Sequence, residues 1–520
     1  MMRCLSRLGV ALLLASASLY AAADGPSVAK DAPVADAVRN RDKQAVLSLL
    51  KAKADVNAPQ NDGATALHWA SYWEDAETTA LLIRAGANVN ARNNFGVNPL
   101  ALAAGNGNAA VMGQLLKAGA DPNGTVLGGE TPLMYAARTG HVNAVNALLE
   151  AGAQVDAKET WNGQTALLWA AAAGHAAVVR TLIDHKADIH ARTNSGGTPL
   201  LFAARKGNMD AVRMLVAAGA DINAERPDQA MPLLVAVING HEDVVDFLLD
   251  QGAKPNVEGG TTDLTRPGTR ATSTELKFPK LTDAEFNREN RRVNNIWGTP
   301  LHAAVHAANL EVGDVHFAVK FDKVRVVNSL LAHGADINAR IRSEEPRWQG
   351  QRYRRPLTGA TPFMLAAKAA DLELMRLLLA NGADPKILTK THITPLMAAA
   401  GIGWASNQDR ATEAQVLEAV KFLVNDLGFD VNDLNDYGES AMHAAAYRGA
   451  NTVVQFLFDK GAKLDVIAKD HRTPLKVADG VEYGNSFAAQ PQTAELLRTL
   501  GARDIPCPGL CEADIPEESK

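Results

Sequence analysis

The sequence predicts an all-α solenoid of stacked helix-turn-helix units, joined by hairpin loops and interrupted by several insertions. A glycine recurs along much of the chain at a spacing of 33 or 34 residues. A Thr-Pro-Leu helix start recurs at five places along the chain. The chain is 47% hydrophobic but only 5% aromatic, and small side chains of this kind let short helices stack closely. A fixed period of this length is typical of repeat architectures.

One stretch, residues 194–226, shows how each unit is specified. Thr198 is a helix N-cap, and Pro199 suits the first helical position, where no backbone donor is needed. Gly207 ends this helix, and Asn208 caps a second one. Gly219 ends the second helix, because glycine takes the left-handed conformation without steric cost. We therefore expect two short helices, a turn and a connecting hairpin in every unit.

The same signals recur along the chain. The residues equivalent to the terminal glycine are Gly86, Gly119, Gly152, Lys186, Gly219 and Gly252. The helix start recurs at residues 131–133, 198–200, 299–302, 394–396 and 473–475. The chain thus resembles the ankyrin-repeat family from about Asp31 to Ala502, with about twelve repeats. Lys186, and Lys53 in the first repeat, should each cost about 1 kcal/mol if they adopt the left-handed conformation.

Departures from the period define the expected organisation. We expect a linker and N-terminal capping repeat at residues 24–60, regular repeats at 61–259 and a hairpin insertion at 260–294. Repeats then continue over 295–502, with insertions near 311–323, 343–357 and 401–412, before a tail at 503–520. Such insertions map to surface loops and often mark a binding face.

The N-terminus has the pattern of a signal peptide, residues 1–23. Arg3 and Arg7 precede an apolar segment at residues 8–19, and three alanines at 21–23 offer a cleavage site. The alanine-rich style resembles a bacterial signal, so we expect export to a periplasm or to the outside, with no membrane attachment after cleavage. A retained anchor is the alternative, although the segment is short for a membrane span.

The two cysteines near the C-terminus suggest a small disulfide. Cys507 and Cys511 flank a Pro-Gly turn, and in an oxidising compartment such a pair forms a bridge. A two-cysteine metal site is the alternative, but no histidine follows in the tail to complete it. We expect no metal and no cofactor.

An aromatic row is the first candidate binding surface. The resemblance implies that the residue after the histidine of the Thr-Pro-Leu-His motif faces the concave side of an ankyrin array. That position holds Trp69, Leu102, Tyr135, Trp169 and Phe202. Tyr72 and Trp73 extend the row, and Arg205 and Lys206 follow Phe202. Exposed aromatic rows mark partner sites, but these rings could also pack on adjacent repeats as the edge of the core.

The enlarged hairpins are the second candidate surface. One contains a group of arginines and aromatic residues: Arg347, Trp348, Arg352, Tyr353, Arg354 and Arg355. The other ends in Trp297 after three arginines. Guanidinium groups bind carboxylates bidentately and stack on rings, so this composition suits an acidic protein surface. A solvated loop that covers the array is the alternative. Nucleic acid is not expected, because the chain has a formal net charge of -6.

The sequence offers little support for an enzyme. It contains no phosphate-binding loop and no nucleophile elbow. His302 and His306 are four residues apart, but the family resemblance assigns His302 a structural role, as it does His68 and His443. We therefore expect a non-enzymatic scaffold that binds another protein. The alternatives are a ligand-binding or catalytic module built around residues 297–316, and a structural spacer.

Overall fold

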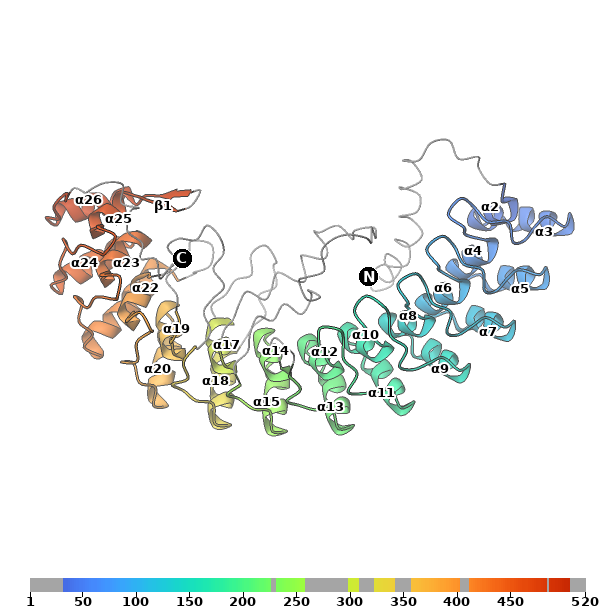
Figure 1. Ribbon diagram of the computed structural model, residues 1–520, viewed down its shortest axis with the longest axis horizontal. Helices are drawn as coiled ribbons and strands as arrows, with labels where there is room; N and C mark the ends of the chain where they lie inside the picture. Colours follow the sequence, from blue (N-terminus) through green and yellow to red (C-terminus); the bar gives the residue numbers. More distant parts are fainter. Residues whose placement is uncertain are drawn as a thin grey trace. The chain divides into compact units, whose positions relative to one another are not determined.

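The computed structural model describes residues 31–225, 231–257, 298–307, 322–341, 357–402, 411–483 and 486–505. These residues form two compact units, which are described separately: an N-terminal unit of residues 31–225 and a C-terminal unit of residues 231–505. In both units the helices come in antiparallel pairs, and Figure 1 shows the first helices of successive pairs in one row and the second helices in another. The predicted all-helical stack of helix pairs is confirmed.

The N-terminal unit contains six helix pairs. These are α2 (Pro33–Arg39) with α3 (Lys43–Lys51), α4 (Ala66–Tyr72) with α5 (Ala76–Arg84), α6 (Pro99–Asn106) with α7 (Ala109–Lys117), α8 (Pro132–Thr139) with α9 (Val142–Glu150), α10 (Ala166–Ala173) with α11 (Ala176–Asp184), and α12 (Pro199–Lys206) with α13 (Met209–Ala217). The core lies between the helices and consists mainly of alanine, leucine and valine.

The C-terminal unit repeats this arrangement. Its pairs are α14 (Pro232–Ile238) with α15 (Glu242–Asp250), α17 (Pro300–Ala307) with α18 (Lys323–Ala332), α19 (Pro362–Lys368) with α20 (Leu372–Ala380), α21 (Pro395–Ala400) with α22 (Glu413–Lys421), α23 (Ala441–Arg448) with α24 (Asn451–Asp459), and α25 (Pro474–Asp479) with α26 (Pro491–Thr499). A π-helical turn, η1 (Phe422–Asp426), extends α22. Between α25 and α26 lies an antiparallel hairpin of β1 (Val481–Tyr483) and β2 (Ser486–Ala488), in which Glu482 pairs with Phe487.

Helix ends follow the capping chemistry that the sequence specifies. The Thr198 side chain accepts a hydrogen bond from the backbone N–H of Leu201, and Asn208 accepts one from Ala211. Gly207 and Gly219 have φ angles of 71° and 96°, in the left-handed region that favours glycine. Lys186 takes the same conformation with φ 66°. Its side chain makes this conformation strained, whereas a glycine there would not be.

An asparagine ladder holds successive pairs in register. Asn90 Nδ2 donates to the Gly119 carbonyl at 3.0 Å, and Asn90 Oδ1 accepts from the Asp121 N–H at 2.8 Å. Asn256 makes the same two contacts with Gly334 and Asp336, at 2.8 and 2.6 Å, although Gly334 lies 78 residues further along the chain. The pairs α14–α15 and α17–α18 therefore stack as direct neighbours despite the extra residues between them.

Candidate functional site

The predicted aromatic row lies mostly inside the molecule. Trp69, Tyr135 and Phe202 are only 7%, 8% and 6% exposed, and Leu102 is 2% exposed. The expectation of one continuous exposed row is therefore wrong for these four residues, whereas Trp169, Tyr72, Trp73 and Arg205 are half-buried. Any role of the row in partner binding stays a prediction.

Contacts with the hairpins explain this burial. Leu102 and Tyr135 pack in a cluster with Val97 and Val126, which belong to the hairpins before α6 and α8. The Phe202 ring lies against Gly197, where a Cβ atom would come within 2.9 Å of it. These rings thus pack at the base of the hairpins. This matches the alternative given by the sequence, in which the rings form the edge of the core.

Arg138 joins the two aromatic residues at the centre of the row. Its guanidinium carbon lies 5.2 Å from the centre of the Tyr135 ring in the same helix and 5.1 Å from the Trp169 ring in the next first helix, α10. Both distances are within the range of cation–π attraction. Among the described residues Arg138 forms no ion pair, so its hydrogen-bonding edges remain available to a carboxylate.

Two buried polar atoms accompany this arginine. Glu130 Oε2 and Trp169 Nε1 are both buried without a hydrogen-bond partner among the described residues. Burial raises the pKa of the Glu130 carboxyl, the charge of Glu159 raises it further, and Arg138 opposes this shift. Burial also raises the pKa of Tyr135 to about 12, with a smaller contribution from Glu130. We call Glu130, Tyr135, Arg138 and Trp169 the Arg138 group.

Arg39 repeats the arrangement at the start of the unit. Arg39 and Arg138 are each the seventh residue of a first helix, and Arg39 lies 5.2 Å from the Trp69 ring of the following first helix. Neither Arg39 nor Arg138 is among the residues that the sequence predicts to bind a partner. Both arginines lie six residues after a first-helix proline and about one period before a tryptophan. This shared spacing is the signal that would have identified them.

Trp69, Tyr72 and Trp73 form a separate aromatic cluster on α4 and its C-cap. Trp69 packs edge-on against Tyr72 at 6.0 Å between ring centres and stacks on Trp73 at 6.4 Å. The Arg41 guanidinium lies 3.9 Å from the centre of the Trp73 ring. The Trp69 N–H donates to Gln60 Oε1 at 2.7 Å, so this indole is satisfied within the protein.

The histidines of the Thr-Pro-Leu-His type are structural. His302 Nδ1 accepts from the Thr299 N–H at 3.2 Å, and Nε2 lies 3.2 Å from the Ala360 carbonyl. With both ring nitrogens engaged, His302 is not free to ligate a metal. His306 lies in α17, but its side chain and Trp297 are outside the described residues. Within the described ranges no group of three or more metal-ligating side chains occurs.

Several predicted features lie outside the described residues. They are the signal peptide at 1–23, the insertion at 260–294, most of the segments at 311–323, 343–357 and 401–412, the cysteines Cys507 and Cys511, and the hairpin residues Arg347, Trp348, Arg352, Tyr353, Arg354 and Arg355. Over the part that is described, no helix combines the length and apolar character that crossing a bilayer requires.

Comparison with known proteins agrees with the architecture. The family model for ankyrin repeats (three copies) matches residues 34–126, 114–193, 189–259, 315–404 and 409–489, together more than half of the chain. The chain is similar to an ankyrin repeat protein of Fowlpox virus (strain NVSL), at 27% identity over 171 residues. That match covers 28% of this chain and 38% of the viral protein, so the chain spans well under two thirds of that relative's length.

Proposed function

Because this chain belongs to the ankyrin-repeat family, we propose that it is a non-enzymatic scaffold that binds a partner protein through the first-helix face of its N-terminal unit. The observation that carries the proposal is the position of Arg138, held between the Tyr135 and Trp169 rings without an ion-pair partner among the described residues. A stacked guanidinium loses little side-chain entropy on binding, so its hydrogen bonds to a partner contribute fully to affinity.

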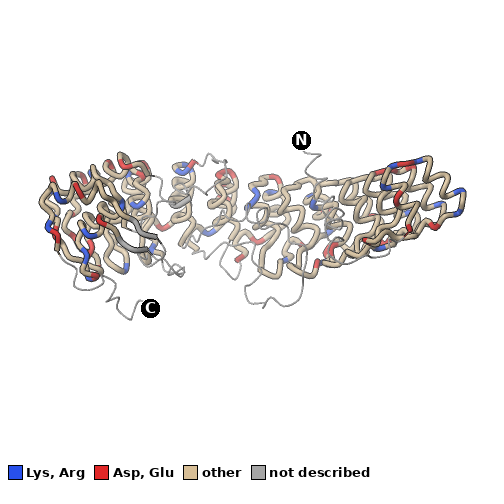
Figure 2. Tube along the Cα trace, turned by 90° about the horizontal axis from the view of Figure 1, so that it is seen from above, with Lys and Arg blue, Asp and Glu red and all other residues tan. Residues whose placement is uncertain are grey.

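The chemistry of this face favours an acidic partner. Basic residues stand in the last turns of α2, α8 and α12: Arg39, Arg138, Arg205 and Lys206. Elsewhere on both units Lys and Arg are interspersed with Asp and Glu (Figure 2). Arg39 and Arg138, each beside a tryptophan ring, would bind carboxylates bidentately and orient the partner on approach.

The arginine-rich hairpins extend the proposal to the C-terminal unit. Arg347, Arg352, Arg354 and Arg355, with Trp348 and Tyr353, have the composition expected of a second contact with an acidic surface. Asn338 Oδ1 accepts from the Asp384 N–H at 2.9 Å, 46 residues further along the chain, so the register of the stack is kept across the segment that contains these residues, and this supports the proposed role.

We also propose that the protein acts after export, in a periplasm or outside the cell. The support is the sequence of residues 1–23, with two arginines before an apolar segment and a run of three alanines. Edman sequencing of protein recovered from the exported fraction would give Asp24 as the first residue; a chain that still begins at Met1 would contradict this proposal.

Capture experiments with matched variants test the binding face. Arg138→Gln removes the stacked charge, and Arg180→Gln removes an exposed arginine from α11, on the second-helix side of the same unit. We expect Arg138→Gln to reduce recovery of the partner by about tenfold, as loss of a charge-assisted contact does. Recovery with Arg180→Gln should equal that of the unaltered chain; equal recovery with both variants would overturn the proposed face.

A further inference from the structure

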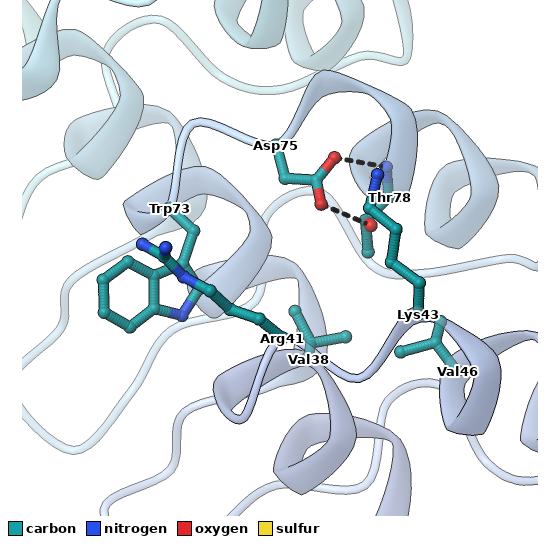
Figure 3. A pocket seen from close by; sticks show the side chains of 7 residues that line it. All are labelled: Val38, Arg41, Lys43, Val46, Trp73, Asp75 and Thr78. Carbon is teal, nitrogen blue, oxygen red and sulfur yellow. Dashed lines mark hydrogen bonds between the residues drawn. The ribbon is translucent and has the colours of Figure 1, made fainter.

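A small cavity lies between the first two helix pairs. It has a volume of about 280 Å³ and lies where the turn between α2 and α3 meets the turn between α4 and α5. Arg41, Lys43 and Trp73 line it together with Val38 and Val46 (Figure 3). The volume suits a single side chain or a chain terminus rather than a larger ligand.

The charge of Arg41 is available in this cavity. Its guanidinium is stacked 3.9 Å from the centre of the Trp73 ring and forms no ion pair with any described residue. Figure 3 shows Arg41 and Lys43 extending along different sides of the space. Lys43 pairs with Glu77 at 2.7 Å, but both side chains are exposed, by 59% and 73%, and an exposed pair of this kind is easily exchanged for another partner.

Asp75 also lines the cavity, and its charge acts on Lys43, but it forms no ion pair with Arg41. Asp75 caps α5: its Oδ1 accepts from the Thr78 N–H at 2.9 Å and its Oδ2 accepts from the Thr78 hydroxyl at 2.7 Å. Both bonds hold the carboxylate turned towards Thr78 (Figure 3). Asp42 is similarly engaged as the cap of α3, where it accepts from Ala45.

An unsatisfied donor provides a second, independent observation. The Trp73 indole N–H is buried and has no hydrogen-bond partner among the described residues, whereas the neighbouring Trp69 N–H donates to Gln60. Burying a donor without an acceptor is costly, so native proteins rarely retain one. An acceptor delivered by a ligand would satisfy this group.

We propose that this cavity binds a carboxylate group of a peptide, held by Arg41 with help from Lys43 and the Trp73 N–H. The apolar side chains of Val38 and Val46 would contact the methylene groups that carry the carboxylate. A glutamate side chain and a C-terminal carboxylate share this chemistry. The site is separate from the Arg138 group, so its failure would leave the proposed scaffold function intact.

Titration of the purified full chain with three labelled alanine-rich peptides tests the proposal. One is acetylated and amidated with a single central glutamate, one has glutamine in its place, and one has no acidic side chain but a free C-terminal carboxylate. Binding of the glutamate peptide alone assigns the site to a side chain, and binding of the free-terminus peptide assigns it to a chain end. Binding of the glutamine peptide as tightly as the other two, or of none of them, would overturn the proposal.

Variants separate the cavity from the rest of the surface. Arg41→Gln should weaken binding about tenfold, because the charge-assisted hydrogen bonds are lost. Trp73→Phe keeps a ring for stacking but removes the N–H, and should weaken binding about threefold. Arg180→Gln is the matched control, since Arg180 is exposed on α11 and does not line the cavity. Equal affinity of Arg41→Gln and Arg180→Gln, with unchanged circular dichroism, would refute the assignment.

Discussion

The imidazole Nε2 of His68 donates a hydrogen bond to the carbonyl oxygen of Val97, 2.9 Å away in the next helix pair. The other ring nitrogen, Nδ1, accepts from the Thr65 N–H at 3.1 Å, which fixes the neutral tautomer with the proton on Nε2. His443 makes the equivalent contact with Arg472 at 3.2 Å. Each of these histidines links the start of its own helix to the hairpin of the next helix pair. Both side chains are buried.

This geometry predicts acid sensitivity. Burial lowers the pKa of His68 and of His302 to about 4, although hydrogen bonds to Val97 and Ala360 oppose the shift. The unfolded chain therefore binds more protons between pH 6.5 and 4. Each buried neutral histidine therefore makes its full contribution to the free energy of unfolding above about pH 6.5. This contribution falls by on the order of 3 kcal/mol as the pH is lowered towards 4.

Urea unfolding of His68→Leu at several pH values checks this prediction. Leucine occupies the equivalent position as Leu168 and Leu201 in later pairs, so the variant should fold. We expect its free energy of unfolding to be lower than that of the unaltered chain at pH 7, and the difference to shrink as pH falls to 4.5. A difference that stays constant with pH would contradict the assignment of a neutral buried His68.

Lys186→Gly should stabilise the N-terminal unit. Lys186 has φ 66° where neighbouring pairs have Gly152 and Gly219. Relief of the left-handed strain, about 1–2 kcal/mol, exceeds the entropy that glycine adds to the unfolded chain, about 0.5–1 kcal/mol. Thermal unfolding should show a gain of about 0.5–1 kcal/mol for Lys186→Gly.

Gly219→Ala is the reciprocal control for this position. A Cβ atom at Gly219 would meet nothing within 4 Å, so the change in stability reports the left-handed strain less the entropy that alanine removes from the unfolded chain. We expect a loss of about 0.5–1 kcal/mol. Loss of stability in Lys186→Gly would show that the lysine side chain outweighs the strain.

The asparagine ladder should add as much to the free energy of unfolding across the longest insertion as it does between regular repeats. Asn90 and Asn256 each bridge a glycine carbonyl and a backbone N–H of the next pair. Replacing either with alanine removes two exposed hydrogen bonds, for an expected loss of about 1–2 kcal/mol. Denaturant unfolding should give similar losses for the two variants; a negligible loss for Asn256→Ala alone would mean that α14–α15 and α17–α18 are not stacked in solution.

The sequence predicts the helix pairs well because capping and turn chemistry are local. Thr198, Pro199, Gly207 and Asn208 set the ends of their helices without reference to distant residues. The exposure of Trp69, Tyr135 and Phe202 could not be predicted from their shared helix position, because the neighbouring hairpins cover them.

Features that depend on neighbouring repeats were missed. Arg138 acquires its role from Trp169, which approaches only when α8 and α10 stack. The π-helical turn η1 and the β1–β2 hairpin follow no helix-start or turn signal that the repeat pattern supplies. A search for arginine one period before an aromatic residue would identify such pairs elsewhere.

The most direct test of the scaffold account is photo-crosslinking from the first-helix face. Ala173 lies one turn after Trp169 on the same face of α10 and is half-buried, whereas Ala177 is exposed on α11. A photoreactive residue at 173 should crosslink a partner protein in the native compartment, and Arg138→Gln should abolish that product. Crosslinking only from 177, or from 173 undiminished by Arg138→Gln, would contradict the proposed binding face.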